Sequence, residues 1–304
     1  MSLITGIYRS FVKTRLAPGK SGWGEELRTR LIMSRMYARS YSWVRQQPNL
    51  FPEVRNYAMF LGHARSGGSL AGALLDAHFN AIVADEVDVF QYVDAGFTRQ
   101  QIFHILLERS QRQAKKGRVK AGRGGKMYSY QVPGAWQGCY ERLFVIGHSK
   151  AGISTQRIGS DPGVLERLQK ILGSIQLKLI LILRNPYDTI STMNIRAGRE
   201  LESGLTQYFA NCATMHEMQD LIPPENLLVM RHEDLLRNPD THLRQLCALL
   251  ELPAAEEYMQ ACSSILYTSP AASRTKIAWS PEMIHKVEAQ IERYPFLKGY
   301  SYES

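Results

Sequence analysis

The sequence predicts an α/β protein with a doubly wound, mostly parallel sheet and helices on both of its faces. Two stretches, residues 142–147 and 177–183, are almost continuously apolar, as is typical of strands that are covered on both faces. From residue 57 onward, strand-like and helix-like stretches alternate, which favours parallel strands joined by crossover helices. Because ligands bind at the carboxyl ends of the strands in such folds, functional residues are expected directly after predicted strands.

The same patterns predict the order of the elements. Strands, indicated by short apolar runs, are expected at 57–62, 81–84, 142–147, 177–183 and 226–230. Helices are expected at 68–78, 98–114, 163–173, 187–197, 203–221, 233–251 and 281–293. Together these elements make residues 56–304 a single α/β domain.

Residues 1–55 precede this alternation and mix basic with aromatic side chains. A helix is expected around residues 24–46, in which Leu27, Leu31 and Met36 lie near one face. We interpret the region as a basic amphipathic helical extension. The favoured role is packing on the main domain, and the alternative is contact with a membrane or a partner.

The segment 111–128 breaks the alternation, because it carries seven lysines or arginines, four glycines and no acidic residue. It is too charged and too rich in glycine to form core, so a mobile surface insertion is expected. Three roles remain open besides a solvated loop: a lid over a nucleotide, a contact with an anionic acceptor, and attachment to nucleic acid. Nucleic acid is the least favoured, because the interleaved aromatic residues of a nucleic-acid platform are missing.

The composition favours anionic partners. The chain has 304 residues and a formal net charge of +9 at pH 7, which points to nucleotides, anionic substrates or an anionic membrane surface. Its 4 cysteines form no C-x-x-C pair, which favours a reducing compartment over a disulfide framework. Residues 1–20 have neither the apolar core nor the cleavage site of a signal peptide, and no apolar run is long enough to span a membrane. A cytoplasmic protein is expected, with peripheral membrane binding as the alternative.

A glycine-rich turn follows the first strand. Measured against the phosphate-loop pattern G-x-x-x-x-G-K-[ST], Gly62, Gly67 and Ser69 match, while Gly68 stands in the place of the lysine. A strand, a turn and a helix N-terminus still form an anion cradle, because the free backbone N–H groups point at the ligand. The missing lysine would have reached the β- and γ-phosphates, and Arg65 offers a cation at a different place. The sequence therefore predicts a phosphate-like donor other than ATP or GTP.

A second anion site is expected after the strand 177–183. Arg184 stands at its carboxyl end, Pro186 suits the first helical position, and Ser191 and Thr192 follow about two turns into the helix. The guanidinium group suits phosphate because its donors form a rigid fork. Two separate anion sites on one sheet indicate a nucleotide that is phosphorylated at both ends.

These motifs resemble those of the sulfotransferases that use 3′-phosphoadenosine 5′-phosphosulfate (PAPS). The run 65–69 is similar to the 5′-phosphosulfate loop of that family, and 184–192 to its 3′-phosphate motif, with Thr192 at the hydroxyl position. The run from Arg274 to Tyr300 resembles the final segment that clamps the nucleotide. The resemblance covers roughly residues 57–300 and implies PAPS as co-substrate, 3′,5′-ADP as product and no metal. The donor-binding residues that it implies are Arg65, Ser66, Gly67, Gly68, Ser69, Arg184, Ser191, Thr192, Arg274 and Lys276.

Local similarity is greatest to the tyrosylprotein sulfotransferases and related bacterial enzymes. On that resemblance Glu86 falls at the position of the catalytic glutamate and Lys150 at that of a catalytic lysine. Arg65 and Lys150 would stabilise the charge of the transferring group, and Glu86 would be the general base. His63 and His148 are the alternative bases. The sequence departs from the family where Gly68 replaces a threonine and where His148 and Ser149 precede the lysine.

The predicted function is transfer of a sulfuryl group from PAPS to a hydroxyl group, with an amine as the second choice. One alternative is a nucleotide-dependent kinase with an atypical phosphate loop, although the loop lysine and a strand-end acid for Mg²⁺ are missing. The other is a non-catalytic module that binds anions or nucleic acid. No motif identifies the acceptor, for which an acidic molecule or a membrane surface is the expectation.

Overall fold

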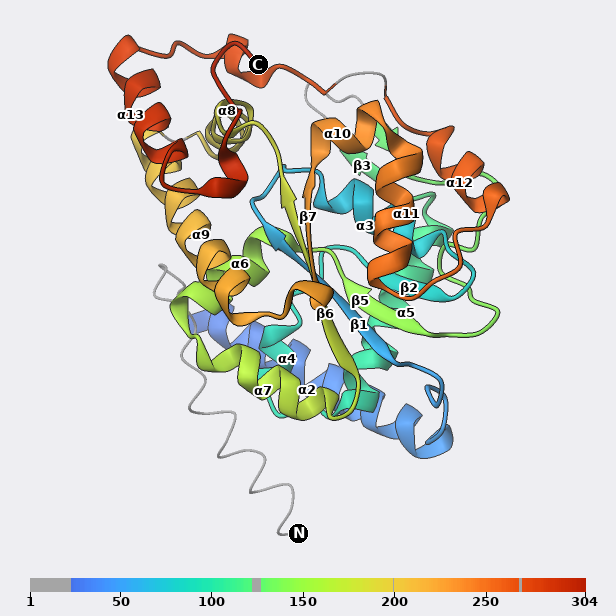
Figure 1. Cartoon of the computed structure of the whole chain (residues 1–304). Helices are drawn as coiled ribbons and strands as arrows, with labels where there is room; N and C mark the ends of the chain where they lie inside the picture. Colours follow the sequence, from blue (N-terminus) through green and yellow to red (C-terminus); the bar gives the residue numbers. More distant parts are fainter. Residues whose placement is uncertain (1–22, 122–126, 199, 268–269) are drawn as a thin grey trace.

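A parallel sheet forms the centre of the protein (Figure 1). The computed structural model describes residues 23–121, 127–198, 200–267 and 270–304. The strands of the sheet are β1 (Asn56–Gly62), β2 (Ala81–Ala84), β5 (Val145–His148), β6 (Gln176–Leu183) and β7 (Leu227–Arg231). They lie in the order β2-β5-β1-β6-β7, and every neighbouring pair is parallel. This order brings the carboxyl ends of β2, β5, β1 and β6 side by side at one edge.

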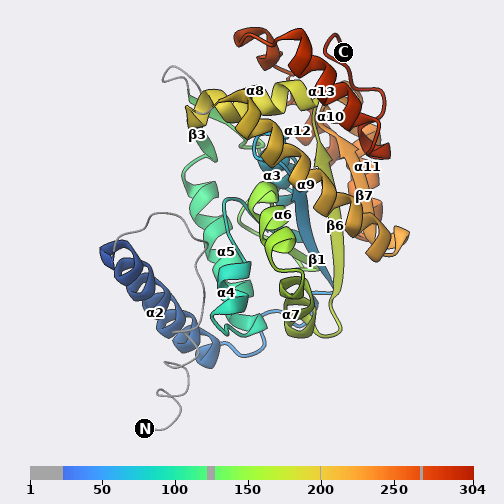
Figure 2. The same ribbon diagram turned by 90° about the vertical axis from the view of Figure 1, so that its left-hand side faces the viewer.

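Helices cover both faces of this sheet (Figures 1 and 2). They are α2 (Trp23–Gln46), α3 (Gly68–Asp76), α4 (Phe90–Asp94), α5 (Arg99–Lys115), α6 (Ala151–Ser160), α7 (Gly163–Leu172), α8 (Pro186–Ala197), α9 (Leu201–Leu221), α10 (His232–Arg237), α11 (Pro239–Leu249), α12 (Glu256–Ser263) and α13 (Pro281–Ile291). Short 3₁₀ turns are η2 (Pro224–Asn226), η3 (Ser273–Lys276) and η4 (Pro295–Leu297).

Side chains of β1 alternate between two apolar clusters, one on each face. Tyr57, Met59 and Leu61 pack with residues of α4 to α9 and α13. Ala58 and Phe60 pack with residues of α3, α10, α11 and α12. Since successive residues of a strand point to opposite faces, this division is what a strand buried on both sides requires. The predicted doubly wound α/β fold is confirmed.

Most predicted boundaries lie within two residues of the observed ones, and two elements differ by more. The helix expected at 233–251 is interrupted, because Pro239 has no backbone N–H with which to continue α10 and instead begins α11. The strand expected at 142–147 begins only at Val145. The helices α4, α6 and α12 were not predicted, and two of them have eight residues or fewer.

The helix α2 packs against α5 along only part of its length (Figure 2). Trp43 stacks on His104 with ring centroids 3.8 Å apart, and Ser40 accepts a hydrogen bond of 3.1 Å from Gln101. Leu27 and Leu31 are 54% and 60% exposed whereas Met33 is buried, so the helix packs on the main domain from Met33 onward. None of the helices in the described ranges is both long and apolar enough to cross a membrane.

The basic segment 111–128 is more ordered than expected. The helix α5 continues to Lys115, and β3 (Val119–Ala121) pairs with β4 (Met127–Ser129) as an antiparallel hairpin. Arg118 is only 4% exposed, because its guanidinium pairs with the buried carboxylate of Asp76. The expectation that no part of this segment enters the core is therefore incorrect for Arg118. Residues 122–126 of the segment lie outside the described residues.

Candidate active site

The loop after β1 has the backbone shape of an anion cradle. Gly62, Arg65 and Gly67 have φ angles of 147°, 74° and 100°, which glycine adopts far more readily than other residues. A Cβ atom on Gly67 would lie 2.4 Å from Nδ1 of His232, so no larger residue fits there. Gly67 caps α3 without a side-chain hydrogen bond to the helix. The first N–H groups of α3 are therefore free of a side-chain cap and suited to an anionic ligand.

Gly68 occupies a confined position behind the loop. A Cβ atom there would lie 3.2 Å from the carbonyl oxygen of Ser149 and 3.5 Å from the Cβ atom of Ala151. A side chain at this position would require the backbone that leads into α6 to move by a few tenths of an ångström.

Asp85 connects the loop to the neighbouring strand ends, and sequence reasoning did not identify it. Its carboxylate is buried and accepts hydrogen bonds from Ser69 (3.0 Å) and Ser149 (3.1 Å) on one oxygen. The other oxygen accepts a hydrogen bond from the ammonium group of Lys120. The available signal was its place directly after β2, which it shares with Glu86.

Glu86 and Lys150, which the sequence placed in the active site, lie close together. Nζ of Lys150 is 3.9 Å from Oε2 of Glu86, and Nζ of Lys120 is 3.7 Å from Oε1. The Glu86 side chain is 50% exposed, and its backbone has a φ angle of 58°. The carboxylate is thus open to a ligand and held between two cations.

Arg65 projects from the loop toward the hairpin. Its guanidinium donates a hydrogen bond of 3.3 Å to the hydroxyl of Tyr128 in β4. Burial raises the pKa of Tyr128, but the hydrogen bond from Arg65 and its charge outweigh burial, so the pKa lies below the ordinary tyrosine value. Nothing in the sequence pattern pointed to Tyr128.

The two candidate histidines are buried beneath the loop. The His63 ring stacks on Tyr208 with centroids 3.7 Å apart, and His148 contacts the hydroxyls of Tyr57 (2.9 Å) and Ser154 (3.0 Å). Burial lowers the pKa of both imidazoles to about 3. Both rings are therefore neutral at physiological pH and packed into the core, which favours Glu86 as the base.

Arg184 lies buried at the carboxyl end of β6, next to the loop. Its guanidinium donates to the carbonyl oxygen of Arg65 (3.2 Å) and to that of Ala271, while its Nε has no partner among the described residues. Burial lowers the pKa of Arg184, and the negative charges of Asp188 and Glu233 oppose this effect. Buried donors are almost always hydrogen-bonded, so the Nε of Arg184 is an exception within the described residues.

The rest of the second motif is tied to the C-terminal segment. Ser191 accepts a hydrogen bond of 3.1 Å from the indole of Trp279, and Thr192 donates one of 2.8 Å to the carbonyl oxygen of Asp188. The carboxylate of Asp188 pairs with Arg274 at 2.9 Å. The structure therefore brings Arg274 to the motif, whereas Lys276 lies exposed on η3.

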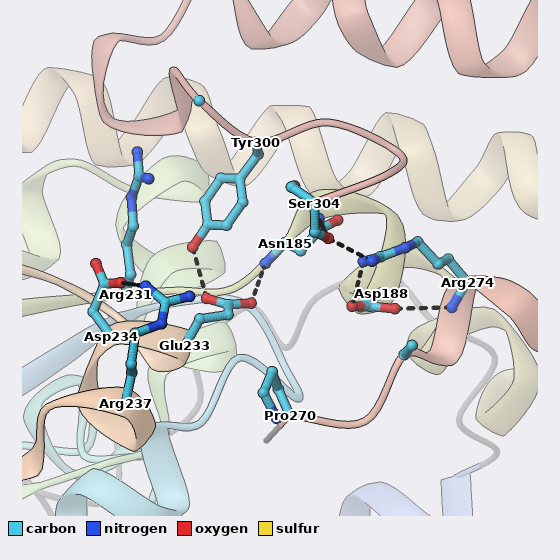
Figure 3. A pocket seen from close by; sticks show the side chains of 12 residues that line it. Asn185, Asp188, Arg231, Glu233, Asp234, Arg237, Pro270, Arg274, Tyr300 and Ser304 are labelled. Atoms are coloured by element: carbon cyan, nitrogen blue, oxygen red, sulfur yellow. Dashed lines mark hydrogen bonds and ion pairs between the residues drawn. The ribbon is translucent and has the colours of Figure 1, made fainter. Parts of the chain in front are cut away.

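A polar cavity of about 440 Å³ opens beside this cluster (Figure 3). Glu233 lines this cavity and accepts hydrogen bonds of 2.8 Å from the Asn185 N–H and the Tyr300 hydroxyl. The other charged side chains of the wall are Asp188, Arg231, Asp234, Arg237 and Arg274. The carboxyl ends of β6 and β7 and the C-terminal segment thus share one charged wall.

A second cavity of about 390 Å³ adjoins Glu86 and Lys150. Its apolar wall consists of Met36, Val87, Tyr92 and Ile105. Its polar wall, besides Glu86 and Lys150, consists of Asp88, Gln91, Glu108, Arg109 and Arg112. A ligand seated there would meet the carboxylate of Glu86 directly. Within the described part of the chain, no cluster of three or more His, Cys, Asp or Glu side chains could hold a metal ion.

Comparison with known proteins gives one family. A model described as "Sulfotransferase family" matches residues 58–257. No curated protein sequence matches the chain. The structure of sulfotransferase STF9 from Mycobacterium avium is similar, with a TM-score of 0.51 and 13% sequence identity over 95% of this chain and 89% of that one.

Two other solved structures have lower TM-scores. The sulfotransferase domain of the Synechococcus PCC 7002 olefin synthase has a TM-score of 0.47 and 17% identity over 77% of this chain and 84% of that one. Mouse sulfotransferase SULT7A1, complexed with PAP, has a TM-score of 0.43 and 11% identity over 78% of this chain and 84% of that one.

Proposed function

The chain belongs to the sulfotransferase family, and from that premise we propose that it transfers a sulfuryl group from PAPS to a hydroxyl group. An amine is the second choice of acceptor. The released product is 3′,5′-ADP.

The buried guanidinium of Arg184 is the observation that carries this proposal. It donates to the carbonyl oxygen of Arg65 at 3.2 Å, and its Nε has no partner among the described residues. The two anion sites that we propose, at the N-terminus of α3 and at Arg184, adjoin each other at the same edge of the sheet. A donor that is phosphorylated at its 3′ and 5′ positions supplies an anion for each site.

The reaction needs positioning more than covalent chemistry. The acceptor oxygen attacks sulfur in line as the bond from sulfur to the 5′-phosphate oxygen breaks, and the acceptor proton passes to Glu86. Arg65 and Lys150 are the cations that would stabilise the charge of the transferring group and the leaving phosphate. Glu86 suits the base because its carboxylate is half exposed and lies 3.9 Å from Lys150.

The acceptor binds, in this proposal, in the cavity that adjoins Glu86. Its volume of about 390 Å³ and its apolar wall suit the body of an organic acceptor. An acidic acceptor or an acidic surface is the preferred class because of the net charge of +9, whereas the cavity wall itself carries Arg109 and Arg112 beside Asp88 and Glu108. The cytoplasm remains the predicted compartment.

Calorimetric titration tests the donor class. We expect 3′,5′-ADP to bind and ATP with Mg²⁺ to bind far more weakly at the same salt concentration. Arg184→Ala should weaken binding of 3′,5′-ADP at least about tenfold, since a hydrogen bond to a charged group contributes about 1.5–3 kcal/mol. Arg293→Ala, on the exposed side of the C-terminal region, is the matched control. Binding of ATP alone would replace this proposal with a kinase, and binding of neither with a non-catalytic module.

A further inference from the structure

The β3–β4 hairpin presents two polar side chains to the proposed active site. Lys120 and Tyr128 are directly opposite each other in the antiparallel register, so their side chains lie on the same face. Lys120 donates to the carboxylate of Asp85, and Tyr128 accepts a hydrogen bond from Arg65. One face of the hairpin therefore touches both the phosphate loop and the acidic pair that follows β2.

Lys120 is the second lysine beside the carboxylate of Glu86. Its Nζ lies 3.7 Å from Oε1, and Nζ of Lys150 lies 3.9 Å from Oε2, so each oxygen faces one lysine. The side chain of Glu86 is 50% exposed, and its two ion pairs are with Lys120 and Lys150. A base that is not held in place loses much of its effect, because misplacement by about 1 Å can cost about 100-fold in rate.

The hairpin is anchored firmly enough to serve as such a support. Arg118, two residues before Lys120, inserts its guanidinium into the core and pairs with Asp76. Asp76 also accepts hydrogen bonds from Val83 N–H (2.7 Å) in β2 and from Ser110 (2.7 Å) in α5. The anchor thus connects the hairpin with the strand that leads directly to Glu86.

We propose that Lys120 and Tyr128 are positioning residues for sulfuryl transfer. Lys120 holds the carboxylate of Glu86 toward the acceptor, and Tyr128 holds the guanidinium of Arg65 beside the transferring group. This inference rests on the proposed function. It also changes the role of the basic segment 111–128, which then takes part in the chemical step and does not merely attract the acceptor.

The variants separate positioning from folding and from donor binding. Lys120→Met removes the ammonium group and keeps the stem, whereas Lys120→Arg keeps a positive charge. Lys116→Met is the matched control, because Lys116 is an exposed lysine in the same segment. For the tyrosine, the test variant is Tyr128→Phe and the control is Tyr41→Phe, since Tyr41 is 51% exposed and lies in α2, outside the hairpin.

The assay uses PAPS labelled with ³⁵S and 4-nitrophenol as the probe acceptor. Label that reaches the phenol and label released as sulfate are both counted, so that transfer to water is measured as well. Calorimetry with 3′,5′-ADP and the melting temperature are recorded for each variant. These readings give the rate of transfer, the donor affinity and the stability separately.

We expect Lys120→Met to lower the transfer rate about 10- to 100-fold and to leave the affinity for 3′,5′-ADP within about threefold of the wild type. Lys120→Arg should recover most of the rate, and Tyr128→Phe should lower it by a smaller factor. A wild-type rate in Lys120→Met, or an equal loss in Lys116→Met, would overturn the inference and leave the proposed function intact. A wild-type protein that neither binds 3′,5′-ADP nor transfers label would overturn both.

Discussion

Replacing Arg118 by methionine would remove the buried cation that anchors the β3–β4 hairpin. The Arg118 side chain is 3% exposed and that of Asp76 is 0% exposed, so the pair is withdrawn from water. Methionine fills a similar length but leaves the carboxylate of Asp76 in the core without its counter-ion. An uncompensated buried charge is among the costliest changes that a core can undergo.

The structure allows the size of this effect to be estimated. Removing one partner of a buried ion pair typically costs about 3–5 kcal/mol. Asp76 keeps hydrogen bonds from the N–H groups of Val83 (2.7 Å) and Gly138 (3.0 Å) and from the Ser110 hydroxyl (2.7 Å), which places the expected loss near the lower end. About 3 kcal/mol is a large part of the about 5–15 kcal/mol by which proteins are stable.

The loss should depend on pH in a defined direction. Burial raises the pKa of Asp76, and the charge of Arg118 opposes that rise. Without Arg118 the folded-state pKa lies further above the unfolded value of about 4. The folded state then binds a proton that the unfolded state has released, so stability falls as pH rises between the two values. The loss of unfolding free energy caused by Arg118→Met should therefore be smaller at pH 5 than at pH 8.

Urea unfolding followed by tryptophan fluorescence at both pH values measures the effect. Arg112→Met is the control, because its side chain is 54% exposed and its ion pair with Glu108 lies on the surface of α5. That variant should lose less than about 0.5 kcal/mol. The double variant Asp76→Asn with Arg118→Met should recover part of the loss. A deficit below about 1 kcal/mol in Arg118→Met, or one that grows at low pH, would refute the reasoning.

Three further predictions concern the site and its surroundings. Glu86→Gln should lower the rate of sulfuryl transfer about 10²–10⁴-fold and leave the binding of 3′,5′-ADP unchanged, as expected for a general base. The control Glu141→Gln, at an exposed position, should have no effect on the rate. Equal activity of the two variants would exclude Glu86 as the base. Gly67→Ala should abolish binding of 3′,5′-ADP in calorimetry, because the new Cβ atom would lie 2.4 Å from Nδ1 of His232 and the residue has a φ angle of 100°. Wild-type affinity in this variant would show that the loop does not require the conformation of Gly67. Because the pKa of His148 is lowered to about 3, its contribution to stability is present above about pH 6.5 and is lost as the pH falls toward 3. In urea unfolding below pH 6.5, the free energy of unfolding should therefore decline less steeply with falling pH in His148→Gln than in the wild type. An equally steep decline in both proteins would contradict this prediction.

Part of the backbone geometry of the proposed donor site could be predicted, because it depends on local sequence. The turn at Gly67 and the strand end at Arg184 each depend on a few consecutive residues, and both lie where the motifs placed them. Glu86 and Lys150 lie close together because each follows the carboxyl end of a strand, and these strands, β2 and β5, are neighbours in the sheet.

The parts that could not be predicted depend on contacts between distant residues. Lys120 and Tyr128 reach the site only because Arg118 finds Asp76, which lies 42 residues earlier in the chain. A run rich in lysine, arginine and glycine gives no indication of such a partner, and the solvated interpretation was the reasonable one. The burial of His63 was equally invisible, because it depends on Tyr208 in a helix far along the chain.

The hydrogen bond from Arg184 to the carbonyl oxygen of Arg65 has a consequence for turnover. On the proposed function, both anions of the donor are still present in 3′,5′-ADP, since only the sulfuryl group departs. The two sites would therefore bind 3′,5′-ADP nearly as tightly as PAPS. The product would compete with the donor, and its dissociation, more than the transfer step, would limit the rate of turnover.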